Sequence, residues 1–358
     1  SLGDICHETR NNRHDKIDMG GIIIELRELM KYARLLIIIC SVGIFLTIGI
    51  PASGQQTGTI TRITTASSRT TGGFYPIIYK NGQFVVFSTS TALTPEDTDN
   101  GMPDLYWYDR QTSTLVLVTV EAVAVTNYDY YYDYYGYTYD ISADGRFVAF
   151  STYLNGMVID DTNNRYDVFV RDMQLNTTQR ISLSDVGAQL TSDSYNPQLS
   201  ADGRFVVFSS TANNLVANDT NNSEDIFMFD RQTSTITRIT LNSQGVEGTG
   251  GYSYLNAVSA DGRFVQFFST MTNLVPNDTN NTEDVFVRDT LLNTTTRASL
   301  DSSGNQVMGI SMGGGVSNDG RYVSFSSTAN NLVAGDINNA EDVFVRDMQT
   351  GIVTRVSV

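Results

Sequence analysis

Aspartate and asparagine recur along the chain in a short pattern whose spacing suits a hard cation. In DTNNTED (278–284), Asp stands at positions 1 and 7 and Asn at positions 3 and 4. Calcium takes several oxygen ligands from a flexible loop, and this spacing supplies them. The pattern occurs in four copies, and a fifth, DTDNGMPD (97–104), has one extra residue. The candidate ligands are Asp97, Asp99, Asp104, Asp161, Asn163, Asp167, Asp219, Asn221, Asp225, Asp278, Asn280, Asp284, Asp336, Asn338 and Asp342.

The same residues have a second interpretation that involves no metal. Asp and Asn side chains accept hydrogen bonds from nearby backbone amides and so close tight turns. The loop is not an EF-hand, because glycine is missing at position 6 and a strand pattern follows it instead of a helix. Both interpretations predict regular recurrence, and the sequence leaves both open. If calcium is the cofactor, we expect it to be structural and to hold each loop to its neighbouring strands.

A tyrosine-rich segment is the strongest departure from this regularity. NYDYYYDYYGYTYD (127–140) holds eight of the 19 tyrosines of the chain. Tyrosine supplies rigid, amphipathic contact area in binding loops, and Asp129 and Asp133 would make such a surface acidic. The alternative is a loop that only packs on its neighbours, or a low-complexity expansion. The candidate ligand-binding residues are Tyr130, Tyr131, Tyr132, Tyr134 and Tyr135.

Residue types on which many enzymes depend are missing from most of the chain. Both histidines and both cysteines lie before residue 41, and Lys80 is the only lysine after Lys31. The body of the chain therefore has no Ser-His-Asp triad, Cys-His pair or ordinary zinc site. Carboxylate pairs could still act on sugars, but the prominent acids recur with the repeat. We expect a non-enzymatic binding protein. The alternatives are a carboxylate- or calcium-dependent enzyme acting on polysaccharide and a repeat module of a larger surface protein.

The formal charge of −16 limits the partners. Acidic and basic residues cancel up to Arg34, so the net charge lies on the rest of the chain. Such a body repels nucleic acid and anionic lipid, which bind clustered Lys and Arg. We therefore expect a protein or glycan partner and no nucleic acid.

Residues 30–54 have the order of a secretory signal peptide. A short positive stretch precedes an apolar run of 16 residues at 35–50, and small residues follow. The run is short for a span of about 20 residues, so cleavage near Gln55 is favoured over an anchor. We expect an exported protein, periplasmic, cell-surface or secreted, with no stable membrane span after cleavage. Residues 1–29 are interpreted as an upstream or non-native leader.

The loop pattern belongs to a longer internal repeat. ADGRFVVFSST (201–211) has counterparts whose glycines stand at 82, 145, 203, 262 and 320, with spacings of 63, 58, 59 and 58 residues. Each unit reads as four strands: a short one such as SYNPQLS, RFVVFSS after an Asp-Gly turn, DIFMFD after the Asx-rich loop, and a threonine-rich outer strand such as STITRITL. Aligned on this turn, Tyr137 matches Tyr195 and Tyr254, which indicates a scaffold position, and Tyr135 matches Tyr252.

Four-stranded units at a fixed period, without helical periodicity, predict an all-β fold, a β-propeller. The alternative is a stack of the same units as an open solenoid. Five repeats are visible, and the ring is either complete with five blades or an incomplete one of six or seven. The repeats extend over 55–358, with blades near 66–120, 121–182, 183–241, 242–300 and 301–358.

SADGRFVVFSS followed by DIFMFDRQT resembles the TolB-like, WD-related propeller repeat of exported bacterial proteins. The resemblance covers residues 57–358 and rests on five copies of the phrase. It implies a β-propeller, whereas it says little about activity, because propellers host many unrelated functions. The units here run about 58 residues with a long internal loop.

Overall fold

The structure is a computed structural model that describes residues 16–18, 23–25, 74–79, 82–98, 103–120 and 138–357. The chain divides into two compact units, Ser1–Arg62 and Ile63–Val358. In the first unit, β1 (Lys16–Asp18) pairs antiparallel with β2 (Ile23–Glu25). The predicted signal peptide at 30–54 and the predicted binding residues Tyr130–Tyr135 lie outside the described residues.

The described part of the second unit forms five four-stranded antiparallel sheets, each with its strands in sequence order. The first blade contains β3 (Phe74–Tyr79), β4 (Phe84–Thr89), β5 (Asp104–Asp109) and β6 (Thr114–Leu117). The second contains β7 (Tyr139–Ile141), β8 (Phe147–Thr152), β9 (Asp167–Asp172) and β10 (Thr177–Arg180). The third contains β11 (Ser194–Leu199), β12 (Phe205–Ser210), β13 (Asp225–Asp230) and β14 (Thr235–Arg238).

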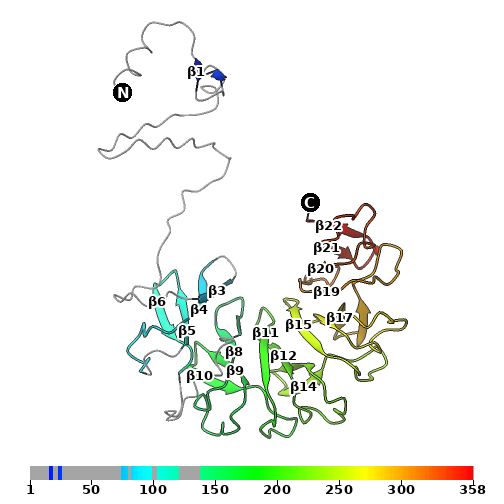
Figure 1. The fold of residues 1–358 in the computed structure, drawn as a ribbon. Coiled ribbons are helices and arrows are strands. Elements are labelled where there is room, and N and C mark those ends of the chain that lie inside the picture. Colours follow the sequence, from blue (N-terminus) through cyan, green and yellow to red (C-terminus); the bar gives the residue numbers. More distant parts are fainter. Residues whose placement is uncertain are drawn as a thin grey trace, which may run out of the picture. The chain divides into compact units, whose positions relative to one another are not determined.

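The fourth blade contains β15 (Ser253–Val258), β16 (Phe264–Ser269), β17 (Asp284–Asp289) and β18 (Thr294–Arg297). The fifth contains β19 (Ser311–Met312), β20 (Tyr322–Ser327), β21 (Asp342–Asp347) and β22 (Val353–Arg355). The five sheets of this unit lie side by side in the order of the sequence (Figure 1). The predicted all-β fold of four-stranded propeller blades is thus confirmed, and the described residues contain no helix. Consequently, no helix in this part of the chain is long and apolar enough to cross a membrane.

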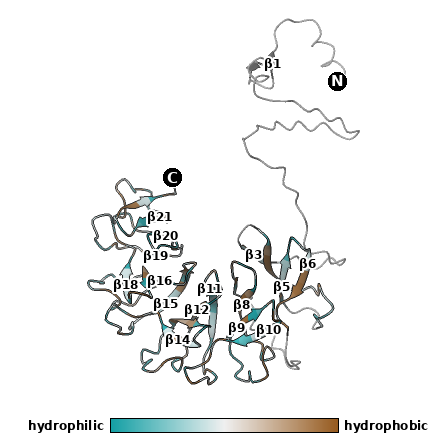
Figure 2. Ribbon diagram, turned by 180° about the vertical axis from the view of Figure 1, so that it is seen from behind, coloured by the Kyte–Doolittle hydropathy of each residue, from teal (hydrophilic) through white to brown (hydrophobic). Residues whose placement is uncertain are grey.

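The core lies between successive sheets. In one cluster, Val168 and Val170 of the second blade pack with Val206 and Phe208 of the third, and all four are buried. The middle strand β12 is buried at nearly every position, as its apolar residues on both parities predict. In Figure 2 hydrophobic colour lies on strands such as β3, β6 and β8. The inner blades therefore contribute both faces to the core, whereas the fifth blade leaves Tyr322 and Val343 exposed on its outer face.

In the last four blades the Asp-Gly turn packs against the preceding blade. Gly203 has φ +68, and a Cβ at this position would overlap the ring of Phe147 in the second blade. Gly145, Gly262 and Gly320 meet Phe84, Phe205 and Phe264 in the same way. Glycine is required because it tolerates the left-handed conformation and leaves room for the ring.

The two edges of each blade differ. We call the edge with the Asp-Gly turns the turn edge, and the edge where the second strand ends and the third begins the loop edge. In the third blade, β12 pairs with β13 from Phe205↔Asp230 at the turn edge to Ser210↔Asp225 at the loop edge. In the third, fourth and fifth blades, the Asx-rich loop and the linker that enters the inner strand lie at the loop edge.

Candidate functional site

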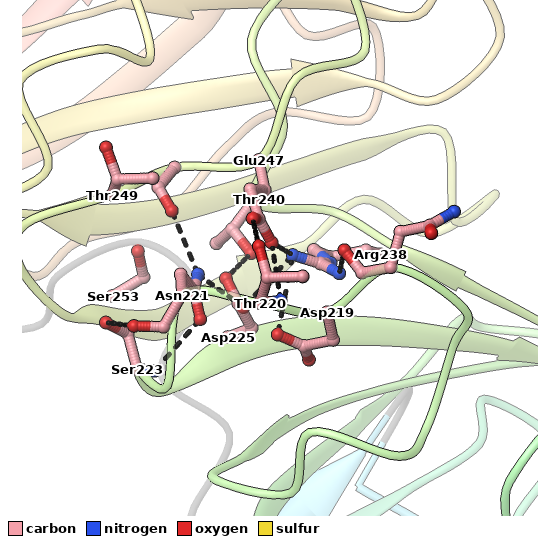
Figure 3. A network of polar contacts seen from close by, with 12 residues as sticks. Asp219, Thr220, Asn221, Ser223, Asp225, Arg238, Thr240, Glu247, Thr249 and Ser253 are labelled. Atoms are coloured by element: carbon pink, nitrogen blue, oxygen red, sulfur yellow. Dashed lines mark hydrogen bonds and ion pairs between the residues drawn. The ribbon is translucent and has the colours of Figure 1, made fainter.

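The loop of the third blade uses its asparagines to build a turn (Figure 3). The side-chain amide of Asn221 donates to Asp225 Oδ2 at 2.8 Å and to the Gly248 carbonyl at 2.9 Å. Its Oδ1 accepts from the Ser223 backbone amide at 2.9 Å. The next residue, Asn222, has φ +51, a conformation that asparagine tolerates better than most residues. Turn chemistry thus accounts for both asparagines of this copy.

The other loops repeat these contacts. Asn163 donates to Asp167 and Asn338 to Asp342, both at 2.9 Å. Asn280 donates to the Val307 carbonyl at 3.0 Å. Asparagine with positive φ recurs as Asn164, Asn281 and Asn339. The predicted amide ligands therefore point into hydrogen bonds of the fold.

An arginine of the outer strand meets the two aspartates of the third loop. Arg238 Nη1 lies 3.7 Å from Asp219, 3.5 Å from Asp225 and 2.5 Å from Glu247 (Figure 3). The Arg238 side chain is only 5% exposed and both aspartates less. Removing one member of such a buried group costs several times more than breaking a surface ion pair.

Three further blades have the same arrangement. Arg180 lies 3.1 Å from Asp161 and 3.8 Å from Asp167. Arg297 lies 3.2 Å from Asp278 and 3.1 Å from Asp284. Arg355 lies 3.1 Å from Asp336 and 3.3 Å from Asp342. We call each set of one arginine and two aspartates a loop triad. In each triad the cation beside the predicted metal ligands is a guanidinium of the same blade.

In two loop triads a buried aspartate has a raised pKa. Burial, followed by the charge of Asp167, raises the pKa of Asp161 to about 7 although Arg180 opposes the rise. Burial raises the pKa of Asp219 to about 6, with Arg238 lowering it and Asp225 raising it. One carboxyl of each of these two triads therefore titrates near neutral pH.

The first blade lacks the triad arginine. Leu117 pairs with Tyr106 at the register position where Arg238 pairs with Phe227. Asp97 Oδ2 accepts a hydrogen bond from the Tyr106 hydroxyl, and Asp97 Oδ1 is buried without a hydrogen-bond donor among the described residues. Asp104 accepts from the Thr119 hydroxyl. The remaining candidate of this copy, Asp99, lies outside the described residues. Over the described part of the chain, no three His, Cys, Asp or Glu side chains form a metal-binding group.

Aromatic side chains of the third and fourth blades cluster at the loop edge. The ring of Tyr254 stacks on Phe268 with centroids 5.4 Å apart, and Tyr252 meets Phe268 edge-on at 6.4 Å. The Tyr252 hydroxyl donates to Glu283 Oε1 at 2.6 Å. Tyr252 and Tyr254 are 42% and 39% exposed. This cluster presents aromatic surface to solvent.

Glu224 joins Tyr195 to this cluster. Burial raises the pKa of Glu224, and burial and the charge of Glu224 raise that of Tyr195. The same charge contributes to the raised pKa of Tyr254 and, after the hydrogen bond to Glu283 and burial, to that of Tyr252, which reaches about 12. Glu224 thus lies within electrostatic reach of all three hydroxyls. We define the aromatic edge as Tyr195, Glu224, Tyr252, Tyr254, Phe268 and Glu283.

Sequence reasoning missed the triad arginines and the aromatic edge. The signal for the arginines is the arginine that recurs in the outer strands of all blades but the first, as in STITRITL. The signal for the aromatic edge is weaker, since the alignment of Tyr195 and Tyr254 with Tyr137 indicates a scaffold position. Tyr252 and Tyr254 match Tyr135 and Tyr137 of the tyrosine-rich segment in the repeat.

Fold and site together define a chain of β-propeller blades whose loop edge carries buried ion pairs and exposed tyrosines. No protein-family model and no curated protein matches the chain.

Among solved structures, the chain is similar to TolB from Acinetobacter baumannii, with 16% identity, a TM-score of 0.43 and coverage of 77% of this chain. It spans 53% of that TolB, about half its length. It is similar to a putative TolB from Agrobacterium tumefaciens, with 15% identity, a TM-score of 0.42 and coverage of 78% of each chain. The β-propeller domain of the Trilobed protease from Pyrococcus furiosus gives 9% identity and a TM-score of 0.45 over 79% of this chain and 71% of that one.

Proposed function

We propose that the protein is an exported, non-enzymatic propeller that binds a protein partner at the aromatic edge. One observation carries this proposal: Glu224 lies among three tyrosines, two of which are more than a third exposed. Tyrosines offer rigid, amphipathic contact area at low entropic cost, as they do in other binding surfaces.

Charge selects the kind of partner. Glu224 and Glu283 supply carboxylates to the aromatic edge, and the chain carries a formal charge of −16. A basic partner is drawn to such a surface and an acidic one repelled. Its lysine or arginine side chains can also pack on tyrosine faces. The partner we propose therefore presents Lys or Arg beside apolar groups.

The carboxylates have structural partners, which supports a binding role rather than catalysis. Asp161, Asp219, Asp278 and Asp336 are each held by an arginine of their own blade. A catalytic acid pair needs two carboxyls in different environments facing a substrate. The loop triads instead repeat one arrangement, an arginine beside two aspartates, in four blades. We therefore assign them to the scaffold of the blades.

The proposal is tested with synthetic ten-residue peptides that combine Lys or Arg with aromatic residues, together with sequence-matched acidic peptides. Binding to the full chain is measured by fluorescence anisotropy at fixed ionic strength. We expect basic peptides to bind and acidic ones to fail, with affinity falling as salt rises. Glu224→Gln should weaken binding about tenfold, because it removes a charge and keeps the shape.

Two results would contradict the proposal. One is equal binding of basic and acidic peptides. The other is binding of a neutral hexasaccharide that Tyr254→Ala abolishes while no peptide binds, which would indicate a glycan partner. Asp202→Asn at the turn edge serves as the control, since its carboxylate is remote from the aromatic edge in the blade register.

A further inference from the structure

Neighbouring blades of the described chain pack through one repeated pair of faces. Each of the four junctions has a buried cluster that joins residues of two successive blades. We call the face that packs on the next blade the forward face, and the face that packs on the preceding blade the rear face. At every junction, the phenylalanine that opens the second strand of one blade also lies against the turn glycine of the next blade. A forward face and a rear face thus fit one another four times within this chain.

The forward face of the fifth blade is exposed. Val343 in the third strand is 43% exposed, and Val356 after the outer strand is 51% exposed. The Val356 amide donates to the Val343 carbonyl at 2.8 Å, and this bond recurs in every blade, which aligns the two positions along the repeat. The residues at these positions of the four earlier blades are all buried, namely Leu105 and Val118, Val168 and Ile181, Ile226 and Ile239, and Val285 and Ala298.

The rear face of the first blade is exposed in the same way. Ile78 occupies the inner-strand position that pairs with the first valine of the second strand, and its side chain is 59% exposed. At this position of the second and third blades, Ile141 and Leu199 are buried in the junction clusters. The atoms nearest to Gly82, the turn glycine of the first blade, belong to Arg110 and Ile78 of the same blade. Among the described residues, no aromatic ring from another blade lies against this glycine.

We propose that the forward face of the fifth blade binds the rear face of the first blade of a second copy of this chain. The contact would reproduce a junction that the fold already makes four times, with Val343 and Val356 on one side and Ile78 on the other. Burial of these side chains would drive the association. Because the two faces differ, the contact is heterologous, and each added copy leaves one face of each kind free.

Charge makes the salt dependence of this contact informative. The formal charge of −16 makes two copies repel one another, whereas the residues that would meet are apolar. Salt screens the repulsion and leaves apolar burial in place. Self-association should therefore strengthen as salt rises, in contrast to the binding of basic peptides at the aromatic edge.

The experiment is sedimentation velocity of the full chain from about 1 to about 200 µM, at about 50 and about 500 mM NaCl. We expect the weight-average mass to rise with concentration to at least about twice that of the monomer. Val343→Glu and Ile78→Glu should each stay monomeric, because each places a carboxylate in the apolar contact. Val246→Glu is the matched control. It adds the same charge at a valine that is 53% exposed between β14 and β15, and it should associate like the original chain.

Mixing the two monomeric variants is the decisive experiment. Val343→Glu keeps its rear face and Ile78→Glu keeps its forward face, so an equimolar mixture should form dimers and nothing larger. Circular dichroism checks that all variants are folded. The proposal is overturned if the original chain stays monomeric, if the mixture stays monomeric, or if Val246→Glu abolishes association. It is also overturned if either face variant associates alone, as it would through another surface or through the apolar run at 35–50.

Discussion

The third blade carries an arginine–aspartate contact at each edge, and the two contacts differ in burial. At the loop edge, Arg238 is 5% exposed and meets three carboxylates. At the turn edge, Arg204 is 39% exposed and makes two hydrogen bonds to Asp230, at 2.9 and 2.6 Å. Water screens the second contact and not the first. Loss of one partner should therefore cost much more stability at the loop edge than at the turn edge.

The largest effect should come from Arg238→Leu. It leaves Asp219, Asp225 and Glu247 together without their cation. Loss of one partner from a buried ion group costs about 3–5 kcal/mol. Urea unfolding measures the free energy of unfolding, and a loss below about 1 kcal/mol would show that solvent reaches this site.

Gly203→Ala tests what stabilises the turn edge. The alanine would be held at φ +68 and its Cβ would overlap Phe147. Strain and overpacking together should cost about 2–3 kcal/mol. Gly187→Ala is the matched control, because Gly187 also has positive φ but has open space around it. Equal losses for the two variants in urea unfolding would mean that strain alone, and not blade contact, sets the cost.

The contributions of buried and exposed aspartates at the two edges to stability should change in opposite directions with pH. The folded pKa of Asp161 is raised to about 7, so the folded state binds a proton that the unfolded state releases near pH 4. Its contribution to stability therefore falls as pH rises from about 4 to 7. Hydrogen bonding to Arg204 lowers the pKa of Asp230 to about 2, so its contribution is lost only as pH falls from about 4 to 2.

Asp161→Asn separates these contributions. We expect its free energy of unfolding to decline less between pH 4.5 and 7.5 than that of the original chain, as measured by urea unfolding at several pH values. Asp230→Asn should leave that slope unchanged. If the slope is the same in Asp161→Asn, the carboxyl is ionised throughout this range in the folded state.

Arg204→Leu should have the smallest effect on stability. The substitution is the same as in Arg238→Leu but lies at the exposed turn edge. Exposed ion pairs contribute about 1 kcal/mol or less to the free energy of unfolding. The difference in urea unfolding between the two variants measures the value of burial directly. Comparable losses would remove the distinction between the edges.

Much of the fold could be predicted because its signals are local. The Asp-Gly turn at 202–203 and the apolar strand 205–210 are adjacent in the chain, and similar pairs recur along the repeat. Asp289 at the end of β17 also makes a local contact, since it pairs with Arg263 across one hairpin.

The candidate site could not be predicted from the sequence, because its contacts join residues that are far apart in the chain. Arg238 reaches Asp219 only because β14 pairs with β13 in one particular register. Glu224 of the third blade acts on Tyr254 of the fourth, and no local sequence pattern connects the two residues. The spacing of the Asx loop predicts a metal ion or a turn, and it gives no sign of the guanidinium that lies beside Asp219 and Asp225. Calcium binding by the Asx-rich loops and ligand binding by the tyrosine-rich segment stay predictions.

The most direct test of the account compares two equally exposed tyrosines at opposite edges. Tyr252 at the loop edge and Tyr322 at the turn edge are 42% and 44% exposed. Each is changed to alanine, and the dissociation constant for the tightest basic peptide is measured by fluorescence anisotropy. If the loop edge is the binding surface, Tyr252→Ala weakens binding about tenfold and Tyr322→Ala leaves it unchanged. Equal effects, or a larger effect of Tyr322→Ala, would contradict a binding surface at the loop edge.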